Sequence, residues 1–312
     1  MTAETVERPY KPGPKDTLKA YVDLTRVHFA LAWPLLFCSG LALAFRNGGG
    51  FSWSLTIRAA LIGLFGFVAG IVLNDYVDRE LDRKDVEFNR LTRYWRPFGK
   101  RPIPSGLIAP RSALGLFLLL VVLTTLLIAT LPYPHSLYVF VLMLASYALE
   151  VFYQVVKRNQ RLPLSQLVGR LDFALFPVAG YLCYGHPDQT ALLYFLFFYP
   201  WVLAHLGVND LADVENDRAR DMKTITVLYG LDGTARWILA FSILNILMAP
   251  LFLTQLGPVA LAGFVLAVLL LAVANRLIML QKSPRAGLIA LPLFHASLLV
   301  YALSIILDSA LA

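Results

Sequence analysis

Residues 55–82 read LTIRAALIGLFGFVAGIVLNDYVDRELD and join an apolar run to a cluster of acidic side chains. The run 55–76 contains one basic residue, Arg58, and no acidic residue before its polar end at Asn74. A helix of about 20 apolar residues crosses the ~30 Å hydrocarbon core of a bilayer. This stretch therefore predicts a membrane-spanning helix that carries carboxylates to one face of the membrane.

Apolar runs of this kind recur along the whole chain. Of its 312 residues, 58% are hydrophobic and 15% are charged, whereas soluble domains average roughly 45–50% and about 25%. This composition excludes a soluble globular enzyme, a disordered chain and a disulfide scaffold. We predict an all-α fold, a polytopic membrane helix bundle of nine transmembrane helices. Their expected ranges are 27–45, 55–76, 112–131, 136–156, 163–184, 190–209, 236–254, 257–280 and 286–307.

Basic residues indicate the orientation of this bundle. Of the 27 lysines and arginines, all but Arg46 and Arg58 lie beyond the same ends of the nine runs or in the part of a run nearer to that end. By the positive-inside rule these ends face the cytoplasm, which places the N-terminus inside and the C-terminus outside. The net charge of +7 is thus a topology signal, and no nucleic-acid partner is expected. We divide the chain into an N-terminal tail, 1–20, and a transmembrane domain, 21–312.

Two nine-residue segments, Asn74–Asp82 and Asn209–Asp217, share the pattern N-D-x-x-D-x-x-x-D. Each lies where an even-numbered helix reaches the cytoplasmic side, so the two helices run parallel and present their motifs at one depth. Helical spacing places positions i, i+3 and i+7 on one face. Three carboxylates on one face repel one another and oppose the dipole of a helix C-terminus. Two such faces therefore indicate that cations lie between them.

Oxygen ligands without neighbouring histidine or cysteine favour Mg²⁺, which commonly bridges protein carboxylates to substrate phosphates. We therefore predict a magnesium site between the motifs. Its expected ligands are Asn74, Asp78, Asp82, Asn209, Asp210, Asp213 and Asp217. The alternative is a pair of solvated helix ends that neighbouring arginines neutralise. Repetition of the pattern on two parallel helices favours a functional site, because ionisable residues in membrane helices are mostly functional.

A basic loop follows each motif. The first contains Arg90, Arg93, Arg96, Lys100 and Arg101, and the second begins with Lys223. Basic side chains beside a carboxylate–metal site suit a diphosphate, because guanidinium and ammonium groups bind the phosphate oxygens that the metal leaves free. Anchoring by the positive-inside rule explains the charge but not its closeness to both motifs. We expect Arg101 and Lys223 to bind diphosphate.

These motifs resemble those of the UbiA-type intramembrane prenyltransferase family, which lie on its second and sixth helices. Residues 101–106, RPIPSG, resemble the family signature R-P-x-x-S-G, and residues 217–230 resemble the continuation of its second motif. The resemblance covers the chain beyond residue 20 and agrees with nine helices. It implies Mg²⁺-dependent transfer of a polyprenyl group from its diphosphate to an acceptor, usually an aromatic ring.

The resemblance also implies roles for single residues. Tyr153 and Lys157 match a Tyr-x-x-x-Lys pattern at the inner end of the fourth helix. Lys157 is then expected to bind diphosphate, and the ring of Tyr153 to stabilise an allylic cation. Arg26 is a further expected diphosphate ligand, and Asp75 or Asp78 is expected to assist deprotonation of the acceptor. An interfacial anchor for Tyr153 and snorkelling for Arg26 are the alternatives.

Two stretches depart from the family pattern. The loop 85–100 is longer than usual, and its residues Tyr94–Pro97 have no assigned role. Arg170 and Asp172, early in the fifth expected helix, either pair with neighbouring helices or belong to an acceptor pocket. Both departures concern the acceptor rather than the metal and diphosphate.

Several alternatives remain open. The acceptor is an aromatic quinone-type precursor, a glycerol-phosphate ether lipid or a tetrapyrrole. Residues 224–230 are at least as similar to the ether-lipid branch of the family as to its aromatic branch. A cation transporter is disfavoured because the motifs lie at the membrane edge and the runs 112–131, 236–254 and 257–280 contain no carboxylate. We expect an integral, multi-pass enzyme with a cytoplasm-facing site that binds a polyprenyl diphosphate and a lipophilic or amphipathic acceptor within the lipid bilayer.

Overall fold

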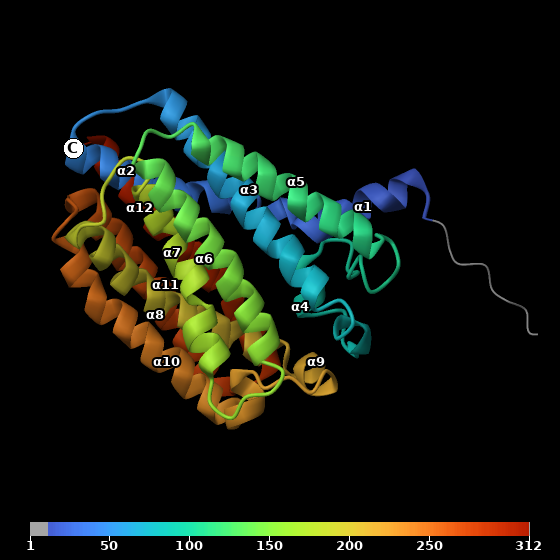
Figure 1. Ribbon diagram of the computed structural model, residues 1–312. Coiled ribbons are helices and arrows are strands. Elements are labelled where there is room, and N and C mark those ends of the chain that lie inside the picture. Colours follow the sequence, from blue (N-terminus) through green and yellow to red (C-terminus); the bar gives the residue numbers. More distant parts are fainter. Residues whose placement is uncertain (1–11, 312) are drawn as a thin grey trace, which may run out of the picture.

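A computed structural model describes residues 12–311, and every regular element in that range is a helix. The long helices lie side by side in one bundle, and α1 extends away from it beside α3 and α5 (Figure 1). In chain order the elements are α1 (Pro14–Thr25), η1 (Val27–Phe29), α2 (Ala32–Gly48), α3 (Trp53–Val77), η2 (Asp82–Lys84), α4 (Leu91–Trp95), α5 (Pro110–Ala129), α6 (His135–Val156), η3 (Ser165–Gly169), α7 (Leu171–Tyr181), α8 (Gln189–Ala212), α9 (Val214–Ala219), α10 (Ile225–Leu253), α11 (Pro258–Gln281) and α12 (Pro284–Leu311).

Eight helical segments within residues 12–311 are long and apolar enough to cross a membrane. They are Val27–Gly48 and the helices α3, α5, α6, α8, α10, α11 and α12. Each corresponds to one of the apolar runs expected from the sequence. The all-helical fold and eight of the expected spans are therefore confirmed.

The expected span 163–184 differs from the prediction. It is divided into a π-helical turn, η3, and the short helix α7, which meet at Arg170. Arg170 forms an ion pair with Glu150 of α6, and Pro177 lies inside α7. A charged side chain in apolar surroundings needs a counter-charge, and π-turns often accompany functional sites. The polar residues Arg170 and Asp172 thus interrupt the regular helix that the hydropathy of this run predicts.

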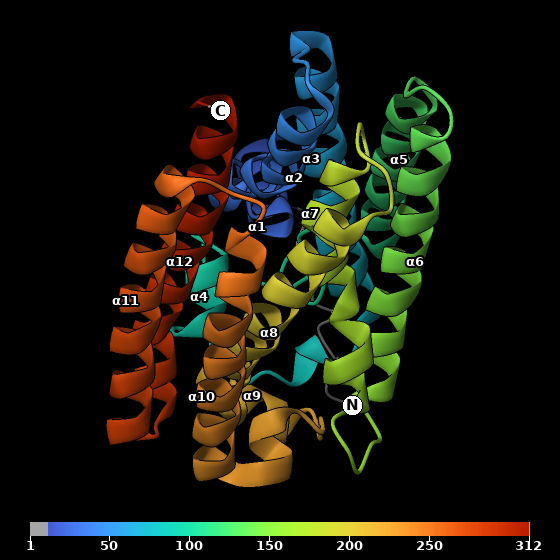
Figure 2. The same cartoon turned by 90° about the vertical axis from the view of Figure 1, so that its left-hand side faces the viewer.

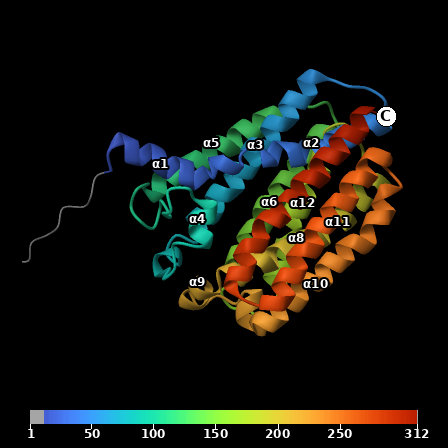
Figure 3. The ribbon, with the colours of Figure 1, turned by 180° about the vertical axis from the view of Figure 1, so that it is seen from behind.

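The bundle presents apolar side chains outward. Helix α11 packs along α12, α10 along α8, and α3 along α5 (Figures 2 and 3). Large exposed apolar side chains cover the outer faces of α5 and α11, among them Leu118, Val122 and Leu126 on α5. Such a surface is unfavourable in contact with water but favourable in contact with the hydrocarbon chains of a bilayer.

Helices α2 and α7 cross at backbone contact. A Cβ atom at Gly40 would lie 1.9 Å from the carbonyl oxygen of Pro177, and one at Gly180 would lie 1.8 Å from that of Phe37. Small residues at helix crossings are a common basis of packing in membranes. The crossing closes the cavity described below on one side, because Phe37 and Phe176 belong to its lining.

We expect Gly180→Ala to destabilise the protein by about 1–3 kcal/mol, because the added methyl group forces two packed backbones apart. Gly115→Ala in α5 is the matched control, since a Cβ there meets nothing within 4 Å. The control should be neutral or stabilising, because alanine favours a helix over glycine. Thermal unfolding of the two variants in detergent measures the difference, and equal stability of both would contradict the close crossing.

Candidate active site

The two motifs lie at neighbouring helix ends, where α4 and α9 also lie (Figures 1 and 3). Helix α3 ends at Val77 and α8 at Ala212, so Asp78 and Asp213 follow the last helical residue. Asp82 begins η2, and Asp217 lies in α9. The expectation that each motif forms one continuous helical face is therefore wrong. Carboxylates oppose a helix C-terminus, and the broken backbone lets each one meet a separate partner.

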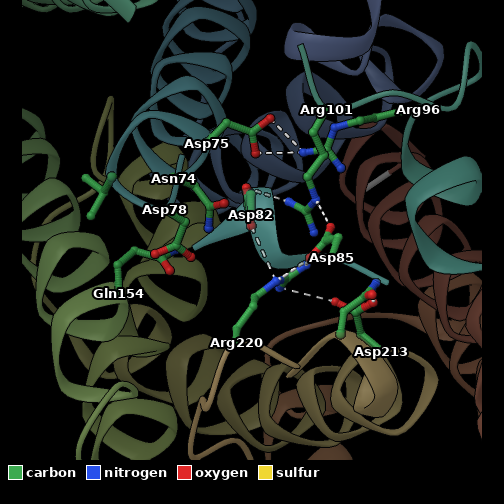
Figure 4. Close-up of polar contacts among 12 residues, drawn as sticks. Asn74, Asp75, Asp78, Asp82, Asp85, Arg96, Arg101, Gln154, Asp213 and Arg220 are labelled. Atoms are coloured by element: carbon green, nitrogen blue, oxygen red, sulfur yellow. Dashed lines mark hydrogen bonds and ion pairs between the residues drawn. The ribbon is translucent and has the colours of Figure 1, made fainter. Parts of the chain in front are cut away.

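The carboxylates of the first motif each contact basic side chains. Asp75 is buried, and Nη2 of Arg96 donates to both of its oxygens at 2.7 and 2.6 Å. Arg26 lies on the same carboxylate at 3.2 Å. Asp78 accepts a hydrogen bond from Nζ of Lys157 at 2.7 Å. Figure 4 shows the pair of Asp75 with Arg96 beside Asp78, Asp82, Asp85 and Asp213.

Arg101 and Arg220 connect the two motifs. Arg101 donates from Nη1 to Asp82 at 2.8 Å and from Nε to Asp85 at 2.6 Å. Arg220 donates from Nε to Asp85 at 2.5 Å and lies 3.5 Å from Asp213 (Figure 4). Arg220 thus bridges carboxylates that follow α3 to a carboxylate that follows α8, and Arg101 joins this network through Asp82 and Asp85.

The second motif binds backbone and hydroxyl donors. Asp210 accepts from the backbone N–H of Ile225 at 2.9 Å, and Asp217 accepts from Oγ1 of Thr224 at 2.8 Å. Asp213 accepts from Nδ2 of Asn216 at 2.8 Å. These bonds hold the start of α10 against the motif, so the loop after α9 is part of the site.

Neighbouring cations only partly compensate the charges of Asp82, Asp213 and Asp217. Burial raises the pKa of Asp217 well above its usual range, and repulsion from Asp213 and Asp210 adds to this effect. Burial also raises the pKa values of Asp213 and Asp82. Burial lowers the pKa of Arg101, but Asp82 and Asp85 outweigh it and leave that pKa raised. The site therefore retains capacity for additional positive charge beside its arginines.

The donor set fits Mg²⁺ in its chemistry. All the acidic groups offer hard oxygen ligands, and Oδ1 of Asp82 is buried and, among the described residues, accepts no hydrogen bond. No three acidic, histidine or cysteine side chains within residues 12–311 converge as a ready-made metal cluster. Arginine and lysine occupy the spaces between the carboxylates instead. Binding of a cation would thus require some of these ion pairs to separate.

Two cavities meet at this end of the bundle. The smaller, of about 130 Å³, is lined by the charged residues Lys157, Asp210, Asp213, Asp217 and Arg220 among others. The larger, of about 280 Å³, extends between α2, α3, α6, α7 and α8 and is lined mainly by apolar side chains. Asn74, Tyr153, Leu206 and Asn209 line both cavities. A charged compartment therefore opens into an apolar one at these four residues.

Tyr153 lies at this junction with cations beside its ring. The guanidinium carbon of Arg170 lies 3.8 Å from the ring centroid, and Nζ of Lys157 lies 4.7 Å from it. Arg170 also pairs with Glu150, and both residues line the larger cavity together with Asp172. Arg170 and Asp172, for which the sequence left two roles open, are therefore part of the cavity wall, and Arg170 also pairs with a neighbouring helix.

Several predicted site residues lie elsewhere than expected. Nζ of the half-buried Lys223 pairs at 2.6 Å with the exposed Asp221, which belongs to neither motif. Oδ1 of Asn209 accepts from Nε1 of Trp95, and Nδ2 of Asn74 donates to Glu150. Arg26 lines the larger cavity rather than the smaller one. Neither Asp75 nor Asp78 lines either cavity.

Sequence reasoning missed two parts of the site. Asp85 bridges Arg101 and Arg220, and a signal for it exists, since it follows Asp82 by three residues. Residues Tyr94–Arg96 contact Asp75, Asn209 and His295. The sequence holds no repeat or spacing that predicts these long-range contacts.

Comparisons with known proteins agree on one family. The model of the UbiA prenyltransferase family matches residues 32–298. A 4-hydroxybenzoate octaprenyltransferase of Pectobacterium atrosepticum is 29% identical over 245 residues, which cover 76% of this chain and 78% of that protein. The apo structure of a UbiA homolog from Aeropyrum pernix K1 has a TM-score of 0.72 at 19% identity and covers 90% of this chain and 98% of its own.

A UbiA homolog from Archaeoglobus fulgidus, solved with DMAPP and Mg²⁺, has a TM-score of 0.62 at 16% identity. The match covers 92% of this chain and 99% of that one. At these identities the two solved structures show a common fold.

We expect Asp217→Asn to stabilise the Mg²⁺-free protein at pH 7. Because the folded-state pKa of Asp217 is raised, the folded chain holds this proton more tightly than the unfolded chain, and stability falls as pH rises above about 4. The variant lacks this loss, so its advantage should shrink toward pH 4. Thermal unfolding in EDTA between pH 4 and 8 measures it.

Asp232→Asn is the control for this prediction, because Asp232 is exposed and pairs with Lys282 outside the site. It should give no such gain. A wild type more stable than Asp217→Asn at pH 7 in EDTA would contradict the claim that the charge of Asp217 is poorly compensated in the folded protein.

Proposed function

Because the chain belongs to the UbiA prenyltransferase family, we propose that it transfers a prenyl group from an allylic polyprenyl diphosphate to an aromatic acceptor, with Mg²⁺, inside the membrane. Family membership and its apolar helices identify it as an integral, multi-pass membrane prenyltransferase. The observation that carries the proposal is the junction of a charged cavity with an apolar one. A prenyl diphosphate has the same division into a charged head and an apolar tail.

The diphosphate head fits the smaller cavity. Lys157 and Arg220 line it and offer an ammonium and a guanidinium group, and Arg101 lies beside it on Asp82 and Asp85. In the absence of substrate these cations pair with carboxylates. We propose that they turn to phosphate oxygens when the diphosphate binds, because charge-assisted bonds to phosphate replace those to carboxylate.

Asp78, Asp82 and Asp213 would lose these cationic partners and become free to bind Mg²⁺. Together with Asp210 and Asp217 they would hold the ion, which would neutralise charge on the leaving diphosphate. The proposal omits Lys223, whose ammonium group is exposed and pairs with Asp221. Asn74 and Asn209 bind protein partners through their amides, so we place them at the cavity junction rather than among the ligands.

The allylic carbon then lies near Tyr153, whose ring already accommodates two cations. An aromatic face stabilises positive charge, and the apolar walls of the larger cavity exclude water that would otherwise capture a carbocation. The acceptor proton needs a base other than Asp75, because Arg26 and Arg96 hold that carboxylate outside both cavities.

An aromatic acceptor is proposed because aromatic side chains line the larger cavity. Trp33 stacks on Phe67 with ring centroids 3.8 Å apart, and Phe173 lies against both rings. The relative from Pectobacterium atrosepticum is named for 4-hydroxybenzoate, which is a single-ring acceptor. A glycerol phosphate would instead need cations that are free to bind its phosphate, whereas Arg26 and Arg170 of the larger cavity pair with Asp75 and Glu150.

We also propose that the site faces the cytoplasm, with the N-terminus on that side and η3 with α7 forming a ninth crossing. The basic residues of the site support this orientation by the positive-inside rule. Arg46 and Arg58 lie at the opposite ends of α2 and α3.

The test is prenyl transfer by the purified protein in detergent. Geranylgeranyl diphosphate is offered with 4-hydroxybenzoate or a glycerol-phosphate ether lipid, in Mg²⁺ or in EDTA. We expect product with the aromatic acceptor in Mg²⁺ alone. Asp213→Asn should lower kcat about 100-fold or more, as removal of a group that stabilises leaving-group charge does.

Asp232→Asn, on the surface beside Lys282, is the matched control and should keep wild-type activity. Wild-type activity of Asp213→Asn, or full activity in EDTA, would contradict the proposed metal role. Product with the glycerol-phosphate ether lipid but not with 4-hydroxybenzoate would contradict the proposed acceptor.

A further inference from the structure

Residues Tyr94–Arg96 connect the loop after α3 to both motifs. Nε1 of Trp95 donates at 3.1 Å to Oδ1 of Asn209, the first residue of the second motif. Nη2 of Arg96 donates to both oxygens of Asp75 in the first motif. The hydroxyl of Tyr94 lies 2.7 Å from Nδ1 of His295 on α12. Three consecutive side chains thus fix the end of α4 to α3, α8 and α12.

Trp95 is part of the wall of the larger cavity. Its partner Asn209 lines both cavities, so the indole lies one hydrogen bond from the place where they meet. The guanidinium carbon of Arg26 lies 5.4 Å from the indole centroid, and the ring of Phe29 lies 5.0 Å away. The indole N–H of Trp95 is therefore hydrogen-bonded and its ring lies beside the guanidinium group of Arg26. These two contacts fix the position of the indole.

The two ends of the larger cavity differ in character. Ile128, Val139, Met143 and Ala179 lie toward the far ends of α5, α6 and α7 and supply an apolar wall that suits a prenyl tail. The end near the motifs contains Trp33, Trp95, Phe173 and His205. If the tail occupies the first end, a ring that attacks the allylic carbon must enter the second.

A hydrogen-bonded chain supports this second end from behind. Nε2 of His205, a cavity residue, lies 2.9 Å from Nε2 of His295, and His295 contacts the hydroxyl of Tyr94. The indole of Trp95 lies 5.1 Å from the His295 ring. Tyr94 and His295 therefore hold two cavity residues, Trp95 and His205, without lining the cavity themselves.

We propose that Trp95 is a specificity-determining residue whose indole forms one wall of the acceptor site and limits it to single-ring acceptors. Tyr94 and His295 are positioning residues that hold this wall in place. The inference rests on the proposed prenyl transfer and assigns a role to the long loop 85–100. Loss of the indole should weaken binding of the acceptor but not of the diphosphate, because Trp95 does not line the smaller cavity.

The test compares wild type, Trp95→Ala, Trp95→Phe and Tyr94→Phe in the transfer assay. Acceptors are 4-hydroxybenzoate and a two-ring hydroxynaphthoate, with geranylgeranyl diphosphate as donor. Trp95→Ala should raise KM for the single-ring acceptor roughly tenfold, leave KM for the donor within about twofold, and improve use of the two-ring acceptor. Trp95→Phe should restore much of the single-ring affinity, because it keeps an aromatic wall.

Tyr94→Phe keeps the ring and removes only the hydroxyl that meets His295, so it should shift acceptor KM in the same direction by a smaller factor. Trp53→Phe, on an exposed tryptophan at the other end of α3, is the matched control. Unchanged acceptor KM and unchanged preference in Trp95→Ala, or equal changes in donor and acceptor KM, would overturn the inference. A wild type that forms no prenylated aromatic product would instead overturn the proposed function.

Discussion

Carboxylates buried at the ends of α3 and α8 must be neutralised, and this requirement organises the polar end of the molecule. An uncompensated charge in apolar surroundings is costly. Arg96 and Arg26 therefore lie on Asp75, Lys157 lies on Asp78, and Arg101 and Arg220 join Asp82, Asp85 and Asp213. These pairs also hold the segments after α4 and α9, which carry Arg96 and Arg220, while hydrogen bonds from Ile225 and Thr224 to Asp210 and Asp217 hold the start of α10.

The same charge requirement connects stability to the proposed chemistry. A site filled with ion pairs is stable without substrate, yet each pair consists of one group that suits a metal and one that suits a phosphate. In the proposed mechanism, substrate and cation binding would replace internal pairs with external ones, so that water need not solvate bare charges. The raised pKa values of Asp213 and Asp217 indicate that the internal compensation is incomplete. The site can therefore accept further positive charge once some of its ion pairs separate.

The sequence predicts the fold well where one physical signal dominates. Eight spans follow from hydropathy, and the two acidic motifs follow from a repeated pattern. At 163–184 only the regular helix was wrongly predicted, because Arg170 pairs with Glu150 and the helix is divided there into η3 and α7. The sequence also did not predict that the helices end within the motifs. Lys223 and Trp95 show a further limit of sequence-based prediction. Lys223 pairs with the exposed Asp221 two residues away, whereas Trp95 bonds Asn209, which is far away in the sequence. Side-chain pairing across 114 residues leaves no local trace in a sequence.

The central claim is that carboxylates and cations of one network bind Mg²⁺ and diphosphate together. Its most direct test is thermal unfolding of the purified protein with inorganic diphosphate alone, Mg²⁺ alone, and both. Because each ligand removes the internal partner of the other, we predict positive coupling, with a rise in Tm from the pair that exceeds the sum of the two separate rises. Stabilisation by diphosphate that is the same in EDTA as in Mg²⁺ would contradict the account.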